Sequence, residues 1–477
     1  MKKGFQCIKN YFAVLFIFIV LPVMSCQKIG CDPNKSDCRG NNTCELRTDD
    51  LYACYEPVYL QGIVFDSATE DPIEGAHVIA VDKTGAAATD VAITDSNGFY
   101  ELQVPVVREP DGSLSEGTYT LRISAPDYLP YPHGIRPAIP IEVTQASHLA
   151  GEGWVFANTS TEIALIALPA EKQGQGSISG NILVEVNDTS PGGVLIVVEG
   201  GTDEPVFGFS DKSGRYTIFN VPEGTWQIYG YKAFLQLDPA NVNLGLGEDK
   251  TEVDLISNSK PFGTVIGSIN IVNAPGGSAT SVVLVPESTF NETFVKGEVP
   301  PGLRAPTPPE NPSIKSGFTI EGVPDGRYVV LAAFENDFLV RDPDPSIGGT
   351  QILHIQVPDG SGYNIDIASS FKVTEALVVV SPGATGPELV LGSPDLIWED
   401  DSSEIKYSIV VYNAFGDEVW RDDDLPRVTG SPNVIVPYGG SPLQAGMYYQ
   451  FRVTSWRDDG PISQTEDLLG TFYIAAE

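Results

Sequence analysis

Short stretches in which apolar and polar residues alternate recur along most of the chain after residue 58. The stretches 117–125, 224–233 and 326–334 each begin with a glycine and then place large or apolar residues at every second position. Alternation with a period of two is typical of β-strands that bury one face. Because turn-forming glycine and proline separate these stretches, the pattern predicts short antiparallel strands throughout.

The alternating stretches belong to a unit that occurs three times. Its most distinctive part runs from a glycine through an aromatic residue to Val-Pro, at residues 94–105, 210–222 and 313–324. Similar opening and closing strands flank this part in each unit. Period-two patterning within units of this size predicts three small β-sandwiches in series. We place them at residues 58–170, 175–258 and 261–370, with a proline-rich loop inserted in the third at 300–312.

The last block, residues 373–477, has a different pattern. Leu443 precedes Tyr449 by six residues, and Phe451 and Val453 continue on the same strand face. This spacing resembles the tyrosine corner of fibronectin type III and related immunoglobulin-like sandwiches, in which Trp398 would be the core tryptophan. The block is therefore expected to be a fourth sandwich of that class.

The first unit resembles the carboxypeptidase regulatory-like domain, a transthyretin-like β-sandwich. The residues that carry the resemblance are Gly62-x-Val64, Pro72-Ile73-x-Gly75-Ala76-x-Val78 and Thr94-Asp95-x-x-Gly98-x-Tyr100. The second unit keeps the turn from Asp211 to Tyr216, whereas the third has Ser313 in place of the aspartate. The resemblance implies an all-β chain of accessory modules that carry no catalytic residues.

The N-terminus has the features of a bacterial export signal. Lys2 and Lys3 precede an apolar run that ends at Met24, and this run is too short to cross a bilayer. Ser25-Cys26 resembles a lipobox, which implies that residues 1–25 are a signal peptide and that Cys26 carries lipid. Gln27 in place of aspartate implies delivery to the outer membrane. The alternative is an ordinary signal peptide, with Cys26 in a disulfide.

Of the six cysteines, Cys7 lies in the signal peptide and Cys26 is expected to carry the lipid. The other four lie in the segment 26–57, which has too few large apolar residues to form a core of its own. An even number in an exported chain predicts two disulfides, and three connectivities are possible. Zinc binding is the alternative, although no Cys-x-x-Cys pair is present. The four residues are Cys31, Cys38, Cys44 and Cys54.

The charge excludes some partners. The chain has 28 Lys and Arg against 63 Asp and Glu, which gives a net charge of −35. Such a surface repels nucleic acid and anionic lipid. No second apolar span follows residue 26, so the lipid is expected to be the attachment to the membrane.

The sequence offers little catalytic chemistry. Its four histidines have no local pairing, and no zinc-protease or serine-hydrolase motif occurs, so we expect a protein that is not an enzyme. His77 lies within a predicted strand and is expected to face solvent. Asp95 and Asp211 are expected to stabilise turns, the alternative being weak calcium binding. No metal or other cofactor is predicted.

Two tryptophans are candidate ligand contacts. Trp226 and Trp398 are expected in cores, whereas Trp154 and Trp420 could stack on sugars or pack on a sandwich edge. The sequence thus favours a lipid-tethered outer-membrane stalk that acts in adhesion, binding or envelope structure. A polysaccharide-binding lipoprotein is the alternative, and an extracellular hydrolase is a third hypothesis. The expected partners are the membrane, through the lipid, and an envelope protein, an extracellular protein or a polysaccharide.

Overall fold

The computed structural model confirms an all-β chain of tandem β-sandwiches behind a disulfide-linked segment. It describes residues 6–7, 26–27 and 30–475, except 34, 36–37, 150–152, 187–188, 201–204, 272–278, 293, 335–338, 344–351, 368–369 and 459. Within these residues the helices are short 3-10 turns: η1 (Val143–Gln145), η2 (Thr159–Thr161), η3 (Ala170–Lys172) and η4 (Glu287–Thr289). Among the described residues no helix is long and apolar enough to cross a bilayer.

Each of the three repeated units forms two sheets. The strands of the first are β5 (Val58–Asp66), β6 (His77–Asp82), β7 (Ala92–Ile93), β8 (Phe99–Val104), β11 (Thr118–Ser124), β12 (Ile141–Glu142), β13 (Ser147–Leu149), β14 (Gly153–Phe156) and β15 (Ile163–Leu165). Those of the second are β16 (Gly176–Leu183), β17 (Leu195–Glu199), β18 (Val206–Phe209), β19 (Arg215–Val221), β20 (Gly224–Tyr231), β21 (Ala240–Leu244), β22 (Asp249–Lys250) and β23 (Leu255–Ile256). Those of the third are β24 (Gly263–Ile271), β25 (Thr280–Pro286), β26 (Arg304–Ala305), β27 (Gly317–Val323), β28 (Gly326–Phe334), β29 (Leu339–Arg341), β30 (Leu353–Val357), β31 (Asn364–Asp366) and β32 (Phe371–Glu375).

The three units share one topology. The opening strand of each, β5, β16 or β24, pairs antiparallel with β8, β19 or β27 and parallel with the closing strands. The second sheets run in the orders β12-β11-β6-β7, β21-β20-β17-β18 and β30-β28-β25-β26, which correspond strand by strand. In the third unit β32 (Phe371–Glu375) pairs in parallel with the opening strand β24.

The Val-Pro turns are held by the same contact in every unit. An aromatic side chain of the following strand is buried and donates a hydrogen bond to the carbonyl oxygen of the proline. Tyr328 Oη lies 2.9 Å from the Pro324 oxygen, Trp226 Nε1 lies 2.9 Å from the Pro222 oxygen, and Tyr119 makes the equivalent bond. A buried Tyr or Trp needs such an acceptor, which explains why both residues suit this position. Trp226 is thus a core residue, as expected.

The fourth sandwich is formed by a three-stranded and a six-stranded sheet. Its core includes Trp398 and Tyr407, whose ring centroids are 5.4 Å apart, and Tyr449, whose hydroxyl accepts a hydrogen bond from the backbone N–H of Gln444 at 2.8 Å. The strands are β33 (Val379–Ser381), β34 (Glu388–Val390), β35 (Asp395–Glu399), β36 (Lys406–Asn413), β37 (Glu418–Pro426), β38 (Asn433–Pro437), β39 (Tyr448–Arg457), β40 (Gly460–Gln464) and β41 (Thr471–Ile474).

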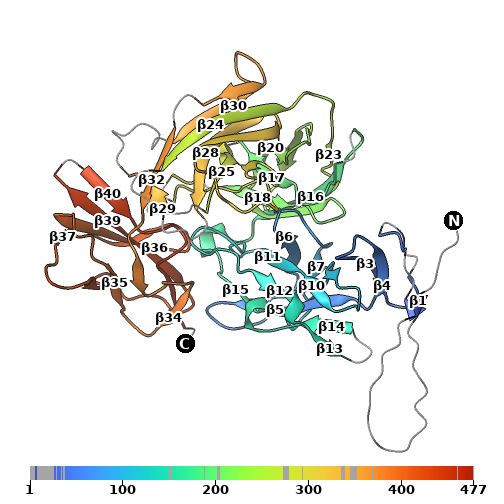
Figure 1. Cartoon of the computed structure of the whole chain (residues 1–477), viewed down its shortest axis with the longest axis horizontal. Helices are drawn as coiled ribbons and strands as arrows, with labels where there is room; N and C mark the ends of the chain where they lie inside the picture. The colour runs from blue at the N-terminus through green and yellow to red at the C-terminus, as the bar shows by residue number, and fades with distance from the viewer. Residues whose placement is uncertain are drawn as a thin grey trace, which may run out of the picture.

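The sandwiches pack side by side. In Figure 1 the C-terminal sandwich, in red, lies against loops of the first unit and of the third. Ile135 of the first unit and Phe294 of the third belong to the same buried cluster as Trp398. Burial of apolar surface between sandwiches favours a compact cluster over the extended stalk that serial repeats suggest.

The cysteine segment forms a small sheet together with a hairpin that follows β8 in the chain. Strands β3 (Thr43–Arg47) and β4 (Tyr52–Tyr55) pair with each other, and β3 pairs in parallel with β9 (Val107–Arg108), whose partner is β10 (Leu114–Glu116). Residues 107–116 thus complete the sheet of the cysteine segment.

Candidate binding cleft

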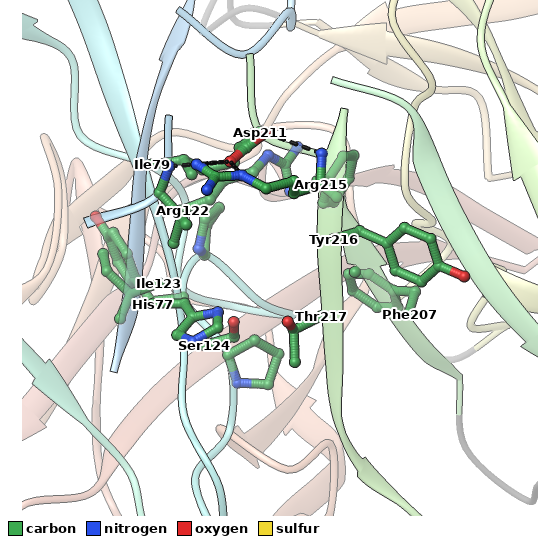
Figure 2. A pocket seen from close by; sticks show the side chains of 16 residues that line it. His77, Ile79, Arg122, Ile123, Ser124, Phe207, Asp211, Arg215, Tyr216 and Thr217 are labelled. Carbon is green, nitrogen blue, oxygen red and sulfur yellow. Dashed lines mark hydrogen bonds and ion pairs between the residues drawn. The ribbon is translucent and has the colours of Figure 1, made fainter. Parts of the chain in front are cut away.

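A cleft lies between the first and second sandwiches. One wall is the outer face of β6 and β11, and the other is formed by β18 and β19, which are edge strands of the two sheets of the second sandwich. The cleft is partly open to solvent, and its cavity volume is about 80 Å³. Tyr131, Pro132 and Phe207 are among the residues that line it, and Figure 2 shows Phe207.

Three polar side chains gather at one end of the cleft. His77 and Ser124 are directly opposite each other in the register of β6 and β11, so they are neighbours on the outer face. Thr217 faces them from β19, as Figure 2 shows. Within the part of the chain that the structure describes, none of these three side chains has a hydrogen-bond partner. They are therefore available to a ligand.

The opposite end of the cleft is charged, but its charges are already paired. Asp211 is buried and forms an ion pair with Arg215 at 3.0 Å. Arg122 lies 3.6 Å from the centroid of the Phe209 ring and 3.2 Å from a carboxylate oxygen of Glu298, in the third sandwich. Neither guanidinium group is an unpaired cation, so the cleft carries no excess positive charge for an anion.

The structure corrects the expected position of His77. The second sandwich covers the outer face of β6, and the centroid of the His77 ring lies 4.9 Å from that of Phe219. Burial lowers the pKa of His77, which the carboxylate of Asp211 partly opposes. The imidazole is therefore neutral at pH 7 and offers one hydrogen-bond donor and one acceptor.

The sequence contains one indication that the outer face of β6 is buried. The strand 77–82 reads HVIAVD, and Ile79 points outward yet is buried. A strand that is apolar at both inward and outward positions is buried on both faces. The sequence does not identify Ser124 and Thr217 as site residues, because alternate polar positions on a strand normally face solvent.

Trp154 and Trp420 do not meet in one site. Trp154 packs against the first core and the Arg108 guanidinium, with its ring centroid 5.1 Å from that of His148. Trp420 packs against the fourth core, 5.4 Å from Tyr438 between ring centroids. Both rings are half-buried. These contacts are those of tryptophans packed at a sandwich edge, the alternative to sugar stacking.

The cysteines form the disulfides Cys31–Cys44 and Cys38–Cys54. Three of their sulfur atoms, from Cys31, Cys38 and Cys54, lie within 4.8 Å of one another. Because a metal ligand must be a thiolate, sulfurs held in disulfides do not provide a zinc site. The pairing chooses one of the three connectivities that the sequence leaves open.

The Asp-containing turns bind their own backbone. Asp95 Oδ1 accepts hydrogen bonds from the N–H groups of Asn97 and Phe99 at 2.8 and 3.0 Å, and these bonds lower the pKa of Asp95. Asp211 Oδ1 accepts from Ser213 and Arg215 in the same way. The carboxylates thus stabilise hairpin turns, as the sequence predicts.

The expected signal peptide, residues 1–25, lies outside the described residues apart from β1 (Gln6–Cys7). The backbone of Cys26 is described in β2 (Cys26–Gln27), but its side chain is outside the description. Lipidation of Cys26 therefore remains a prediction from the sequence.

Comparison with known proteins supports the class of the C-terminal sandwich. Residues 393–469 match the model of the Rha78A-like, N-terminal immunoglobulin domain. The expectation of an immunoglobulin-like sandwich is thus confirmed for this part of the chain. In the structure β33 and β34, which precede the matched residues, also belong to its sheets. A search of curated proteins found no significant match to the chain.

Three solved structures give examples of the matches to this chain. The Bacillus anthracis TIE protein is 11% identical, with a TM-score of 0.15, over 85% of this chain and 68% of its own. BcpA, the major pilin subunit of Bacillus cereus, is 11% identical, with a TM-score of 0.18, over 67% of this chain and 100% of its own. The shaft pilin SpaA from Lactobacillus rhamnosus GG is 11% identical, with a TM-score of 0.17, over 43% of this chain and 98% of its own.

Proposed function

We propose that this chain is a lipid-anchored, non-catalytic protein of the bacterial outer membrane that binds an envelope or extracellular partner. Its first three sandwiches act as carboxypeptidase regulatory-like accessory modules, and the disulfide-linked segment joins them to the lipid. Support for the anchor comes from the apolar run before Ser25-Cys26 and from Gln27. The sandwiches supply a compact scaffold that holds a binding site between them.

The observation that carries the binding function is the cleft between the first two sandwiches. Ligand sites occur preferentially between domains and combine apolar walls with a few converging polar groups. His77, Ser124 and Thr217 are such groups, and they come from two different sandwiches. All three side chains are half-buried and have no hydrogen-bond partner among the described residues, so a ligand can bond to them by displacing water.

Replacing Cys26 with alanine should release the protein from the membrane. The single lipid-bearing residue would be lost, and the acidic body has no affinity for an anionic bilayer. Fractionation of cells that express each form, together with labelling by a palmitate analogue, measures the effect. Wild type should be labelled and sediment with membranes, whereas Cys26→Ala should be unlabelled. A Cys7→Ala control should behave as wild type. Labelling of Cys26→Ala would contradict the anchor.

Filling the cleft should abolish attachment of the soluble chain, residues 27–477, to envelope material. Thr217→Trp places a large ring where the three polar groups meet, and Ser124→Trp does so from the opposite wall. Thr225→Trp is the matched control, because Thr225 is an exposed residue of β20 outside the cleft. Binding to isolated envelopes is measured by co-sedimentation, with melting temperature as a check on folding. Equal binding by both folded cleft variants would contradict the proposal.

A further inference from the structure

The hydrogen-bonding character of the cleft narrows the chemistry of its ligand. A serine or threonine hydroxyl donates and accepts, and a neutral imidazole does both through its two nitrogens. Ser124, Thr217 and His77 therefore match ligand groups that donate and accept at the same atom, which hydroxyl groups do. A carboxylate or phosphate only accepts hydrogen bonds when ionised and would leave acceptors in the cleft unsatisfied.

The charges of the cleft point the same way. Arg122 and Arg215 are already paired with Glu298 and Asp211 at 3.2 and 3.0 Å. An anionic ligand would have to compete with these carboxylates, and it would approach a chain with a net charge of −35. A neutral ligand meets neither obstacle.

The walls add a preference for shape. Phe207 presents aromatic surface, and Pro132 adds a rigid apolar face. The pyranose ring of a sugar carries hydroxyls at its edge and apolar C–H groups on its faces, so it combines both requirements. Because the mouth of the cleft is open, a longer chain can continue from the bound residue into solvent.

Resting on the binding function proposed above, we infer that the cleft between the first two sandwiches binds a neutral sugar residue of a polysaccharide. His77, Ser124 and Thr217 hydrogen-bond its hydroxyls, and the aromatic and proline walls pack on its ring. This assigns carbohydrate recognition to side chains other than Trp154 and Trp420.

The test uses the soluble chain, residues 27–477, in affinity electrophoresis through gels containing a neutral glucan, mannan, galactan or xylan. Polygalacturonate serves as the acidic comparison. Wild type should be retarded by at least one neutral polysaccharide and not by polygalacturonate. Ser124→Ala/Thr217→Val removes two hydroxyls with little change of shape and should raise the dissociation constant about 10- to 30-fold. Thr225→Val removes a hydroxyl outside the cleft and should leave retardation unchanged.

Three results would overturn the sugar assignment: no retardation by any neutral polysaccharide, retardation by polygalacturonate alone, or equal retardation of the double variant. If Trp154→Ala/Trp420→Ala loses retardation while Ser124→Ala/Thr217→Val keeps it, sugar binds at the tryptophans instead. The envelope-binding experiment separates this failure from that of the proposed function. Wild type could attach to envelopes but bind no polysaccharide, while Thr217→Trp abolishes the attachment. The cleft would then be a site for a protein partner.

Discussion

Replacing Arg108 with methionine should destabilise the N-terminal sheet by about 3–5 kcal/mol, because it leaves a buried carboxyl group without its partner. Arg108 Nε lies 2.6 Å from Glu45 Oε2, and both side chains are only 1% exposed. The guanidinium also donates to the backbone oxygens of Glu56 at 2.7 Å and Gly112 at 3.1 Å. It thus links β3, β9 and the start of the first sandwich.

The loss should depend on pH. Burial raises the pKa of Glu45 to about 7, although Arg108 opposes the shift. Because this pKa is higher in the folded than in the unfolded chain, its contribution to stability is complete below about pH 4.5 and is lost as pH rises through about 7. Without Arg108 the ionised carboxylate loses the cation that stabilises it, and the rise in the pKa of Glu45 is opposed less. The deficit of Arg108→Met should therefore be largest at pH 8 and smaller at pH 5.

Native-state hydrogen exchange of the β3 and β9 amides measures the free energy of opening this sheet. Arg421→Met is the matched control, because its ion pairs with Glu418 and Asp423 are exposed and should be worth less than about 1 kcal/mol. The double variant Glu45→Leu/Arg108→Met should recover much of the loss, since no buried charge remains. A loss for Arg108→Met no larger than the control's would refute the argument.

The repeated architecture could be predicted because its determinants are local. Glycine turns, Val-Pro and alternating strands recur in all three units, and their second sheets have the same strand order. The same pattern predicts that Trp226 is a core residue, and it is buried. The sequence does not indicate that β32 pairs with β24, because the two strands lie about a hundred residues apart. The hydrophobic pattern of a strand does not show which distant strand it pairs with.

The cleft could not be predicted, because two sandwiches create it. Alternation tells which side of β6 faces its own core, but not whether another sandwich covers the other side. The alternation therefore predicts that His77 faces solvent, and it does not distinguish Ser124 and Thr217 from ordinary exposed positions. The Glu45–Arg108 pair was missed for a similar reason, since its residues are 63 positions apart in the chain. Only the apolar run around Ile79 hinted that the outer face is buried.

Replacing Gly180 with alanine should unfold the second sandwich or cost about 4 kcal/mol or more, an effect that only severe mechanisms produce. A Cβ atom at this position would lie 1.9 Å from the carbonyl oxygen of Val253. The same oxygen accepts the hydroxyl hydrogen bond of Tyr216, which is opposite Gly180 in the register. The glycine thus lets the closing segment approach the opening strand closely enough for the tyrosine to bridge them.

The equivalent glycines of the other two units should differ in how much stability is lost on replacement with alanine. A Cβ at Gly62 would lie 2.0 Å from the Thr161 carbonyl oxygen, where Tyr100 makes the equivalent bond at 2.8 Å. At Gly267 the nearest atom is Cζ of Phe318 at 2.6 Å. A ring edge can move more readily than a backbone carbonyl, so the cost should be smaller there. The residue opposite Gly267 has no hydroxyl, so no bridging bond is lost.

Thermal unfolding of the four single alanine variants should therefore rank Gly180 and Gly62 as the most damaging, Gly267 as intermediate and Gly317 as mild. Gly317 is the control, because its nearest atom would be 3.7 Å from the new Cβ and its backbone needs no glycine. A mild effect at Gly180, equal to that at Gly317, would show that the closing segment can yield. The repeated glycine–aromatic pair would then be a matter of turn chemistry, and the close approach of the two strands would not be required for folding.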